Sequence, residues 1–200
     1  MDAHAWDARY AASDRVWSVG PNQFVASELA GLAPGRAVDL AAGEGRNAVW
    51  LAGLGWSVTA VDFSAVALER GRDGAPDADV DWVTADVLAW RPDAPTYDLA
   101  LIAYLQLPAD ERGQAVRSAF GCLREGGTFL LVAHDSSNLT EGTGGPQDPT
   151  VLMTADDVLY DLGDAAYDVV SAGRLERQVP SADGTTLTAY DVLVRVLRTG

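Results

Sequence analysis

The strongest structural signal in this chain is the run Val38-Asp39-Leu40-Ala41-Ala42-Gly43-Glu44-Gly45-Arg46-Asn47-Ala48. An apolar, strand-like segment leads into two closely spaced glycines, and a helical pattern begins directly after them. Gly43 and Gly45 carry no Cβ atoms, so the backbone at these positions can approach a ligand closely. The first N–H groups of the new helix have no partners inside it and can therefore meet polar or anionic ligand groups. The run predicts a ligand site where a buried strand meets a helix.

Strand-like and helical segments alternate along the chain after this run. Apolar runs typical of buried strands occupy residues 37–42, 58–62, 80–85, 97–103 and 128–134. Apolar residues at helical spacing occupy residues 48–54, 65–68 and 115–123. Such alternation is typical of a parallel sheet with crossover helices.

The last part of the chain has a different pattern. Residues 168–179 and 185–198 are two strand-like segments, separated by a turn that contains Asp183-Gly184. We expect them to form an antiparallel hairpin that closes the sheet. The predicted fold class is therefore α/β, a Rossmann-like seven-stranded sheet that is mostly parallel, with a C-terminal antiparallel hairpin and helices on both faces.

Composition restricts the partners of this chain. Its 200 residues, 48% of them hydrophobic, suit one domain with a full-sized core. The formal net charge is −15, with 29 acidic residues against 14 Lys and Arg, which opposes binding to nucleic acid and to anionic membranes. Cys122 is the only cysteine, so neither an intramolecular disulfide nor a thiolate metal cluster can form. The N-terminus is unlike a secretory signal, and the longest apolar run, 99–107, is too short to span a bilayer. We expect a cytoplasmic protein; the oligomeric state is left open.

A carboxylate at the end of the second predicted strand extends the ligand site. Asp62 lies 17 residues after Gly45, where it can accept hydrogen bonds from both hydroxyls of a ribose. Gly43, Gly45 and Ala48 also satisfy the G-x-G-x-x-A fingerprint of dinucleotide-binding proteins. On these residues alone, a nicotinamide cofactor and S-adenosylmethionine both remain open.

Three further features favour S-adenosylmethionine. Asp39 lies four residues before Gly43, where its charge would repel a pyrophosphate but attract a cationic amino group, directly or through water. Asp86 follows the third strand and can accept a hydrogen bond from the amino group of adenine, although capping a helix N-terminus is an alternative role for it. The chain also lacks the second domain in which most nicotinamide dehydrogenases bind their substrate.

The run from Asp39 to Gly45 resembles the first motif of the seven-stranded S-adenosylmethionine-dependent methyltransferases. Its continuation, residues 45–52, is similar to that of the narrower tellurite-resistance and thiopurine-type group. Val61-Asp62-Phe63-Ser64 resembles the second motif of these enzymes, and Ala85-Asp86-Val87 resembles their adenine-binding motif. Many members carry Gly followed by Cys or Ser where this chain has Ala41-Ala42. Both alanines are small, so the backbone can still approach the donor closely.

The resemblance implies a role for each matching position. Asp39 would lie near the amino group of the donor, and Asp62 would hold its ribose. The adenine would lie between Phe63 and Val87, with Asp86 at its N6 amino group. The other implied contacts to the donor come from Ala41, Gly43, Gly45, Arg46 and the carbonyl of Ala103.

Other candidate residues have two interpretations. Trp17, like the aromatic residues at 6 and 10, either anchors an N-terminal helix on the sheet or forms a lid over the donor, near its positive sulfonium. His134 ends the fifth strand, where the ligand cleft of an open α/β sheet forms, and is either a core residue or a general base. Arg46 contacts the donor carboxylate or the substrate, or is solvated. Arg177 on the hairpin is either an exposed strand residue or a substrate contact.

We expect one domain over residues 1–200, with a helical lid segment (1–33), a donor-binding βα core (34–134), an active-site loop (135–150), and a helix with the terminal hairpin (151–200). The expected activity is SN2 transfer of a methyl group from S-adenosylmethionine to a small-molecule acceptor, which leaves S-adenosylhomocysteine and requires no metal. The sequence does not identify the acceptor. The alternative functions are a nicotinamide-dependent oxidoreductase and a non-catalytic S-adenosylmethionine-binding module.

Overall fold

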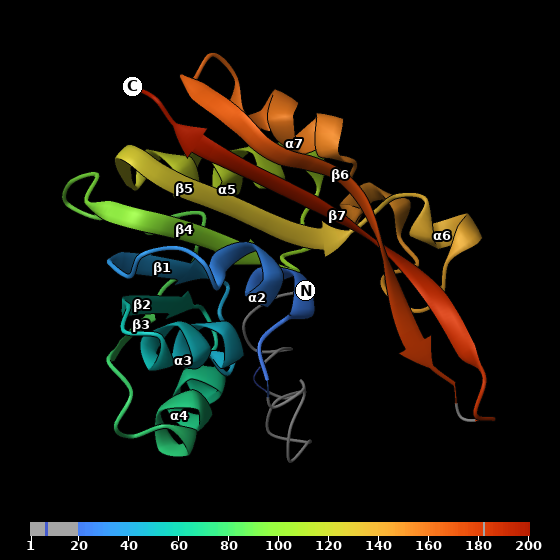
Figure 1. The fold of residues 1–200 in the computed structure, drawn as a ribbon, viewed down its shortest axis with the longest axis horizontal. Helices are drawn as coiled ribbons and strands as arrows, with labels where there is room; N and C mark the ends of the chain where they lie inside the picture. Colours follow the sequence, from blue (N-terminus) through green and yellow to red (C-terminus); the bar gives the residue numbers. More distant parts are fainter. Residues whose placement is uncertain (1–6, 8–19, 182) are drawn as a thin grey trace.

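The computed structural model of the chain describes residue 7 and residues 20–181 and 183–200. The described residues form a seven-stranded sheet with the strand order β3-β2-β1-β4-β5-β7-β6 (Figure 1). The strands are β1 (Arg36–Leu40), β2 (Ser57–Asp62), β3 (Val80–Thr84), β4 (Tyr97–Ala103), β5 (Leu123–His134), β6 (Tyr167–Pro180) and β7 (Thr186–Arg198). The helices are α2 (Gln23–Leu29), α3 (Arg46–Gly53), α4 (Ala65–Gly74), α5 (Ala109–Gly121), α6 (Asn138–Glu141), the 3-10 turn η1 (Pro149–Val151) and α7 (Ala155–Leu162).

Strand β1 lies in the interior of the sheet and pairs in parallel with β2 on one side and β4 on the other. Residues 37–40 are at most 1% exposed, because helices cover a parallel sheet on both faces. Asp39 is the one polar residue among these four. Because β1, β2, β4 and β5 run in the same direction, the residues that follow them gather at one edge of the sheet, where open α/β sheets bind ligands.

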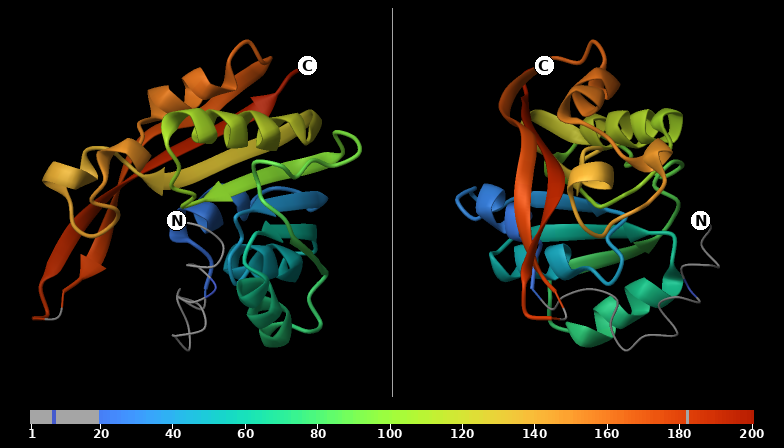
Figure 2. Two further views of the ribbon diagram at one scale, coloured as in Figure 1. Left: turned by 180° about the vertical axis from the view of Figure 1, so that it is seen from behind. Right: turned by 90° about the vertical axis from the view of Figure 1, so that its right-hand side faces the viewer.

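Helices pack on both faces of the sheet (Figure 2). On one face, α2 and α3 bury residues such as Leu29 and Leu51. On the other face, α5 and α7 bury residues such as Val116 and Val158. The expected α/β architecture with helices on both faces is confirmed. Among the described residues, no helix is long and apolar enough to cross a membrane.

Strand β7 lies between β5 and β6 and is antiparallel to both. Residues 191–197 pair with β5, whereas residues 186–190 pair only with β6. The outer ends of β6 and β7 therefore project beyond β5 as a two-stranded arm (Figures 1 and 2). The expected seven-stranded, mostly parallel sheet with a C-terminal antiparallel hairpin is confirmed.

Three details differ from the sequence-based expectations. Strand β5 begins at Leu123 rather than at residue 128. Residues 124–127 are polar or glycine, as in a loop, but they belong to the strand because the pairing of β4 with β5 shifts its register there. The link from β3 to β4, residues 85–96, forms turns and contains no helix. Residues 135–150, expected to form a long loop, contain α6 and the start of η1.

Gly45 closes the glycine loop and immediately precedes α3. Its backbone is left-handed, with φ of 70°, a conformation that residues with a side chain rarely adopt. A Cβ atom at this position would lie 2.4 Å from the ring of Trp82 on β3. Gly45 is therefore required both by the backbone turn and by the packing of the loop on the sheet.

We expect Gly45→Ala to lower the free energy of unfolding by about 2–5 kcal/mol, because the left-handed backbone costs about 1–2 kcal/mol and overpacking against Trp82 costs about 1–3 kcal/mol. Gly53→Ala, in α3 with open space around it, is the matched control and should be neutral or stabilise by up to about 1 kcal/mol. Urea denaturation measures both changes. A Gly45→Ala variant as stable as the wild type would contradict this packing.

Candidate functional site

The glycine loop is held against the end of β2 by Asp62. The Asp62 carboxylate accepts a 2.8 Å hydrogen bond from the Gly43 N–H at Oδ2 and another of 2.8 Å from the Ser64 N–H at Oδ1. Burial raises the pKa of Asp62, and the two N–H groups partly offset that rise. Each carboxylate oxygen has a second lone pair, so Asp62 can hold the loop and still accept a hydrogen bond from a ligand.

Asp39 has no such partners. It is 1% exposed, and neither of its carboxylate oxygens has a hydrogen-bond partner within residues 20–181 and 183–200. Burial raises the pKa of Asp39 to about 7; the positive charge of Arg46 lowers it, the negative charge of Asp62 adds to the rise, and the nearby Ala48 N–H, which does not meet hydrogen-bond geometry, also lowers it. An unpaired buried carboxylate is costly, so this position favours a ligand that brings a cation.

The loop backbone is left-handed at Ala41, Gly43 and Gly45, with φ of 59°, 58° and 70°. Glycine adopts this region freely, whereas alanine at position 41 costs about 1–2 kcal/mol. Residues with a side chain in this conformation concentrate at functional sites. The three residues expected to line the donor thus share one tight turn beside Asp39.

The residues expected at the adenine end lie after β2 and β3. Asp86 is exposed, and its Oδ1 accepts a 2.9 Å hydrogen bond from the Leu88 N–H, so it caps a turn. Val87 is 8% exposed and belongs to the core, whereas Phe63 and Ala103 are half-buried. Trp17 lies outside the described residues. The donor contacts of these residues stay predictions.

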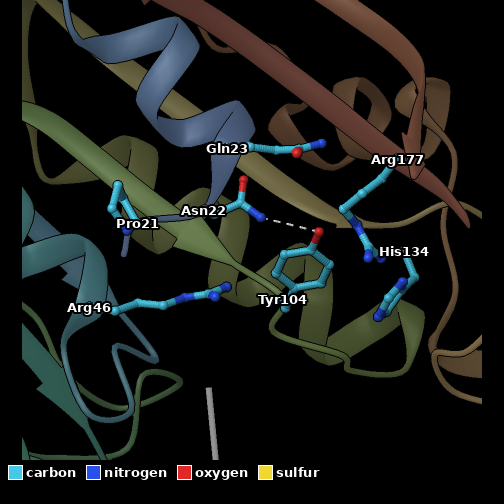
Figure 3. A pocket seen from close by; sticks show the side chains of 7 residues that line it. All are labelled: Pro21, Asn22, Gln23, Arg46, Tyr104, His134 and Arg177. Carbon is cyan, nitrogen blue, oxygen red and sulfur yellow. Dashed lines mark hydrogen bonds between the residues drawn. The ribbon is translucent and has the colours of Figure 1, made fainter. Parts of the chain in front are cut away.

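A pocket of about 330 Å³ opens at the carboxyl ends of β4 and β5 (Figure 3). Its volume is that of a small-molecule site. Arg46 enters from α3 on one side, Arg177 from β6 and His134 from β5 lie on the opposite side, and Tyr104 lies between the two sides (Figure 3). The pocket is lined by Pro21, Asn22, Gln23, Arg46, Tyr104, His134 and Arg177.

Behind this pocket lies the carboxylate of Asp191 on β7, which is fully buried. It accepts hydrogen bonds of 2.9 Å from the Tyr104 hydroxyl and 2.6 Å from Arg177 Nε. His134 Nδ1 lies 3.2 Å from Asp191 Oδ1, within ion-pair distance but not aligned as a hydrogen bond. Burial acts to raise the pKa of Asp191, but His134, Arg177 and Tyr104 outweigh it, so that the pKa is lowered. Burial and the charge of Asp191 raise the pKa of Tyr104 to about 12.

Asn22 joins the N-terminal helix to both parts of the site. Its side chain caps α2 by accepting hydrogen bonds of 2.9 and 3.2 Å from the N–H groups of Phe24 and Val25. Its own backbone N–H donates to Asn47 Oδ1 at 2.9 Å, directly after the glycine loop. Its Nδ2 donates to the Tyr104 hydroxyl at 3.3 Å. Helix α2 therefore bridges the glycine loop and the pocket.

The structure brings the predicted residues His134, Arg46 and Arg177 together around one pocket, although their roles stay predictions. Sequence reasoning did not single out Tyr104 or Asp191. Tyr104 directly follows β4, and its φ of 60° is unusual for a residue with a side chain. Asp191 interrupts an apolar strand, and a carboxylate in that position requires a buried partner.

Two sequence comparisons find similarity to methyltransferases. Residues 37–127 match a family model described as a methyltransferase domain. The chain is also 32% identical, over 120 residues, to a demethylmenaquinone methyltransferase of Clavibacter sepedonicus. This match covers 60% of the chain and 47% of that protein, so the chain spans about half the length of the curated relative that it matches.

Solved structures share the fold over most of the chain. The N-methyltransferase NodS from Bradyrhizobium japonicum WM9, in complex with S-adenosyl-L-homocysteine, is 18% identical, with a TM-score of 0.75 and all of both chains covered. TehB from Haemophilus influenzae, a tellurite-resistance protein, is 16% identical, with a TM-score of 0.73 over 92% of this chain and 64% of its own. The resemblance seen in the motifs agrees with these matches: residues 37–127 match the methyltransferase domain model, and the chain shares its seven-stranded fold with the S-adenosylhomocysteine-bound N-methyltransferase NodS.

Proposed function

We propose that the protein transfers a methyl group from S-adenosylmethionine to a small-molecule acceptor. Asp39 carries this proposal. Its carboxylate is buried beside the glycine loop and has no hydrogen-bond partner among the described residues. The amino group of the methionine moiety is a cation that this carboxylate can hold, whereas the pyrophosphate of a dinucleotide would meet it as a like charge.

The remaining donor contacts follow the order of the motifs along the sheet edge. Asp62, already oriented by two backbone N–H groups, holds the ribose hydroxyls. Arg46, at the first position of α3, contacts the methionine carboxylate. Asp86 accepts from the adenine amino group through the carboxylate that also caps its turn. The other donor contacts in this proposal are Ala41, Gly43, Gly45, Phe63, Val87, Ala103 and Trp17.

The acceptor occupies the pocket between Arg46 and Arg177. Its volume of about 330 Å³ and the net charge of −15 support a small molecule rather than a nucleic acid. The similarity to an N-methyltransferase and to a demethylmenaquinone methyltransferase also supports a small acceptor.

The chemical task of the protein is orientation. When bound, S-adenosylmethionine supplies a methyl group that its sulfonium already activates for SN2 attack. The pocket residues hold the nucleophile in line with that methyl group, and orientation of this kind contributes up to about 7–11 kcal/mol. His134, at the end of β5, accepts the proton of a hydroxyl or amine acceptor as general base.

Parallel calorimetric titrations with S-adenosylhomocysteine and NAD test the donor assignment. We expect binding of S-adenosylhomocysteine and none of NAD. A panel of hydroxyl, amine and thiol compounds, assayed for S-adenosylhomocysteine formation from S-adenosylmethionine, then tests transfer. Binding of NAD in place of S-adenosylhomocysteine contradicts the proposal. Binding of S-adenosylhomocysteine without turnover of any acceptor favours a non-catalytic module.

We expect Asp39→Asn to stabilise the ligand-free protein while weakening donor binding. The folded-state pKa of Asp39, about 7, lies above the unfolded value of 3.8, so the folded protein loses stability as the pH rises from about 4 to 7. Asparagine stays neutral, so its advantage grows through this window, to at most about 4 kcal/mol, and is constant above it. Thermal unfolding at pH 4, 5.5 and 8 measures the difference.

The same variant should bind S-adenosylhomocysteine more weakly by about 1.5–3 kcal/mol, because a charge-assisted hydrogen bond is lost. Wild-type affinity should rise with pH through about 7 as Asp39 ionises, and the variant should lack this rise. Asp77→Asn, an exposed residue in the α4–β3 link, is the control for the change of one charge. Unchanged affinity in a folded Asp39→Asn protein removes Asp39 from the donor site.

We expect His134→Ala to lower kcat for a hydroxyl or amine acceptor by about 10²–10⁴-fold, the range for a lost general base. Donor affinity should stay unchanged, because the donor motifs lie on other strands. Gln178→Ala, on the exposed side of β6, should leave kcat unchanged. Steady-state kinetics with calorimetry of S-adenosylhomocysteine provide the measurement. A kcat within threefold of wild type for such an acceptor ends the catalytic role of His134.

A further inference from the structure

Asp191 is the most deeply buried charge on the acceptor side of the site. It is 0% exposed and lies directly opposite His134 in the antiparallel pairing of β5 with β7. The neighbouring residues Val192 and Leu193 are core residues, so Asp191 stands inside an apolar strand. A carboxylate is retained there at a free-energy cost unless its contacts compensate it.

Three side chains from three other parts of the sheet converge on Asp191. Arg177 comes from β6, Tyr104 follows β4, and His134 ends β5. The Tyr104 hydroxyl and Arg177 Nε donate to Oδ2, while His134 Nδ1 lies 3.2 Å from Oδ1. These contacts lower the pKa of Asp191 although burial acts to raise it, so the carboxylate is ionised at neutral pH.

The imidazole ring of His134 is held on several sides. Its Nδ1 is buried and faces Asp191. The Tyr104 ring packs against it at a centroid distance of 4.9 Å. Gly145 lies so close that a Cβ atom would be 3.1 Å from the ring, and its φ of 74° also favours glycine. The His134 side chain itself lines the pocket (Figure 3).

We propose that Asp191 is the positioning residue of the acceptor site: it keeps the proton of neutral His134 on Nδ1 and leaves Nε2 as the base that faces the acceptor. A base held in this way is needed for an acceptor that arrives protonated, so the acceptor class is a hydroxyl or amine rather than a thiolate or other anion. The acceptor class rests on the proposed function, whereas the position of the proton on His134 does not.

The step balances with S-adenosylmethionine as the only co-reactant. The lone pair of the acceptor oxygen or nitrogen forms the bond to the methyl carbon. The carbon–sulfur bond breaks, and its electron pair stays on sulfur. The acceptor proton passes to His134 Nε2 and then to water.

The charged and titratable groups around His134 are Asp191 on β7, Arg177 on β6 and Tyr104 after β4, with Arg46 on α3 across the pocket. Asp191 offsets the positive charge that arrives with the proton, whereas the two arginines oppose it. The same carboxylate orients Arg177 and Tyr104, which line the pocket together with His134.

Nitrogen NMR of the imidazole rings tests the position of the proton without any acceptor. The chain has two histidines, His4 and His134, so a His4→Gln variant leaves one imidazole to observe. In this variant we expect neutral His134 to carry its proton on Nδ1. In the same variant with Asp191→Ala, the proton should move largely to Nε2, because Nδ1 has lost the carboxylate. A wild-type spectrum with the proton on Nε2 overturns the proposal, and so does an unchanged spectrum in a folded Asp191→Ala protein.

If Asp191→Ala does not fold, the spectrum with Asp191 intact decides alone. Asp168→Asn, an exposed residue on β6, is the matched control for one lost charge and should leave the spectrum unchanged. Circular dichroism and S-adenosylhomocysteine titration establish whether each variant is folded.

Kinetics then separate positioning from general support of the fold. Asp191→Ala should lower kcat by about 10²–10⁴-fold for a hydroxyl or amine acceptor while the KM for S-adenosylmethionine stays unchanged. The kcat–pH profile of Asp191→Ala should differ from that of the wild type, because the carboxylate no longer faces the ring. A profile identical to wild type overturns the positioning role. Turnover of thiols alone overturns the acceptor class, and absence of any methyl transfer contradicts the proposed function while leaving the NMR result intact.

Discussion

Two backbone N–H groups, from Gly43 and Ser64, converge on the buried carboxylate of Asp62, and the geometry of the glycine loop depends on this contact. It ties the loop after β1 to the end of β2, although the two segments are 19 residues apart. The loop meets Asp62 through left-handed backbone at Ala41, Gly43 and Gly45. The same turns bring the start of α3, with Arg46, next to Asp39.

Asp39 and Asp191 are two buried aspartates with opposite electrostatic surroundings. Asp39 has no hydrogen-bond partner among the described residues, and burial raises its pKa to about 7. Asp191 has Arg177, Tyr104 and His134 around it, and its pKa is lowered. The partners, rather than the depth of burial, decide the direction of each shift. A carboxylate whose charge is already compensated can orient other side chains, whereas one without a partner favours a cationic ligand.

The two sides of the site are connected through α2. Asn22 receives both helix-capping hydrogen bonds, donates its backbone N–H to Asn47 beside the glycine loop, and donates its side chain to Tyr104 beside the pocket. Tyr104 in turn donates to Asp191. A continuous chain of hydrogen bonds therefore runs from α3 to β7, and the pocket is built from segments far apart in the sequence.

Local patterns were sufficient to predict most of the fold and the position of the glycine loop. Apolar runs marked the strands within a few residues, and the glycine spacing with Asp39 and Asp62 marked the loop at the carboxyl edge of the sheet, because these signals lie within short stretches of chain. Local patterns also predicted the terminal hairpin, from the turn at Asp183-Gly184, and they placed His134 at the end of a strand. The bulge at the start of β5 was missed because its polar residues and glycines have the composition of a loop.

Tyr104 and Asp191 could not be paired by such patterns, because 87 residues separate them. Their contact depends on β7, rather than β6, lying next to β5 in the sheet. A hairpin inserted in the opposite order would have the same alternation of apolar residues, but Asp191 would then not face His134 across the β5–β7 pairing. Strand order is set by the burial of side chains against two helical layers and not by any local propensity, so the arrangement around His134 is a property of the tertiary structure.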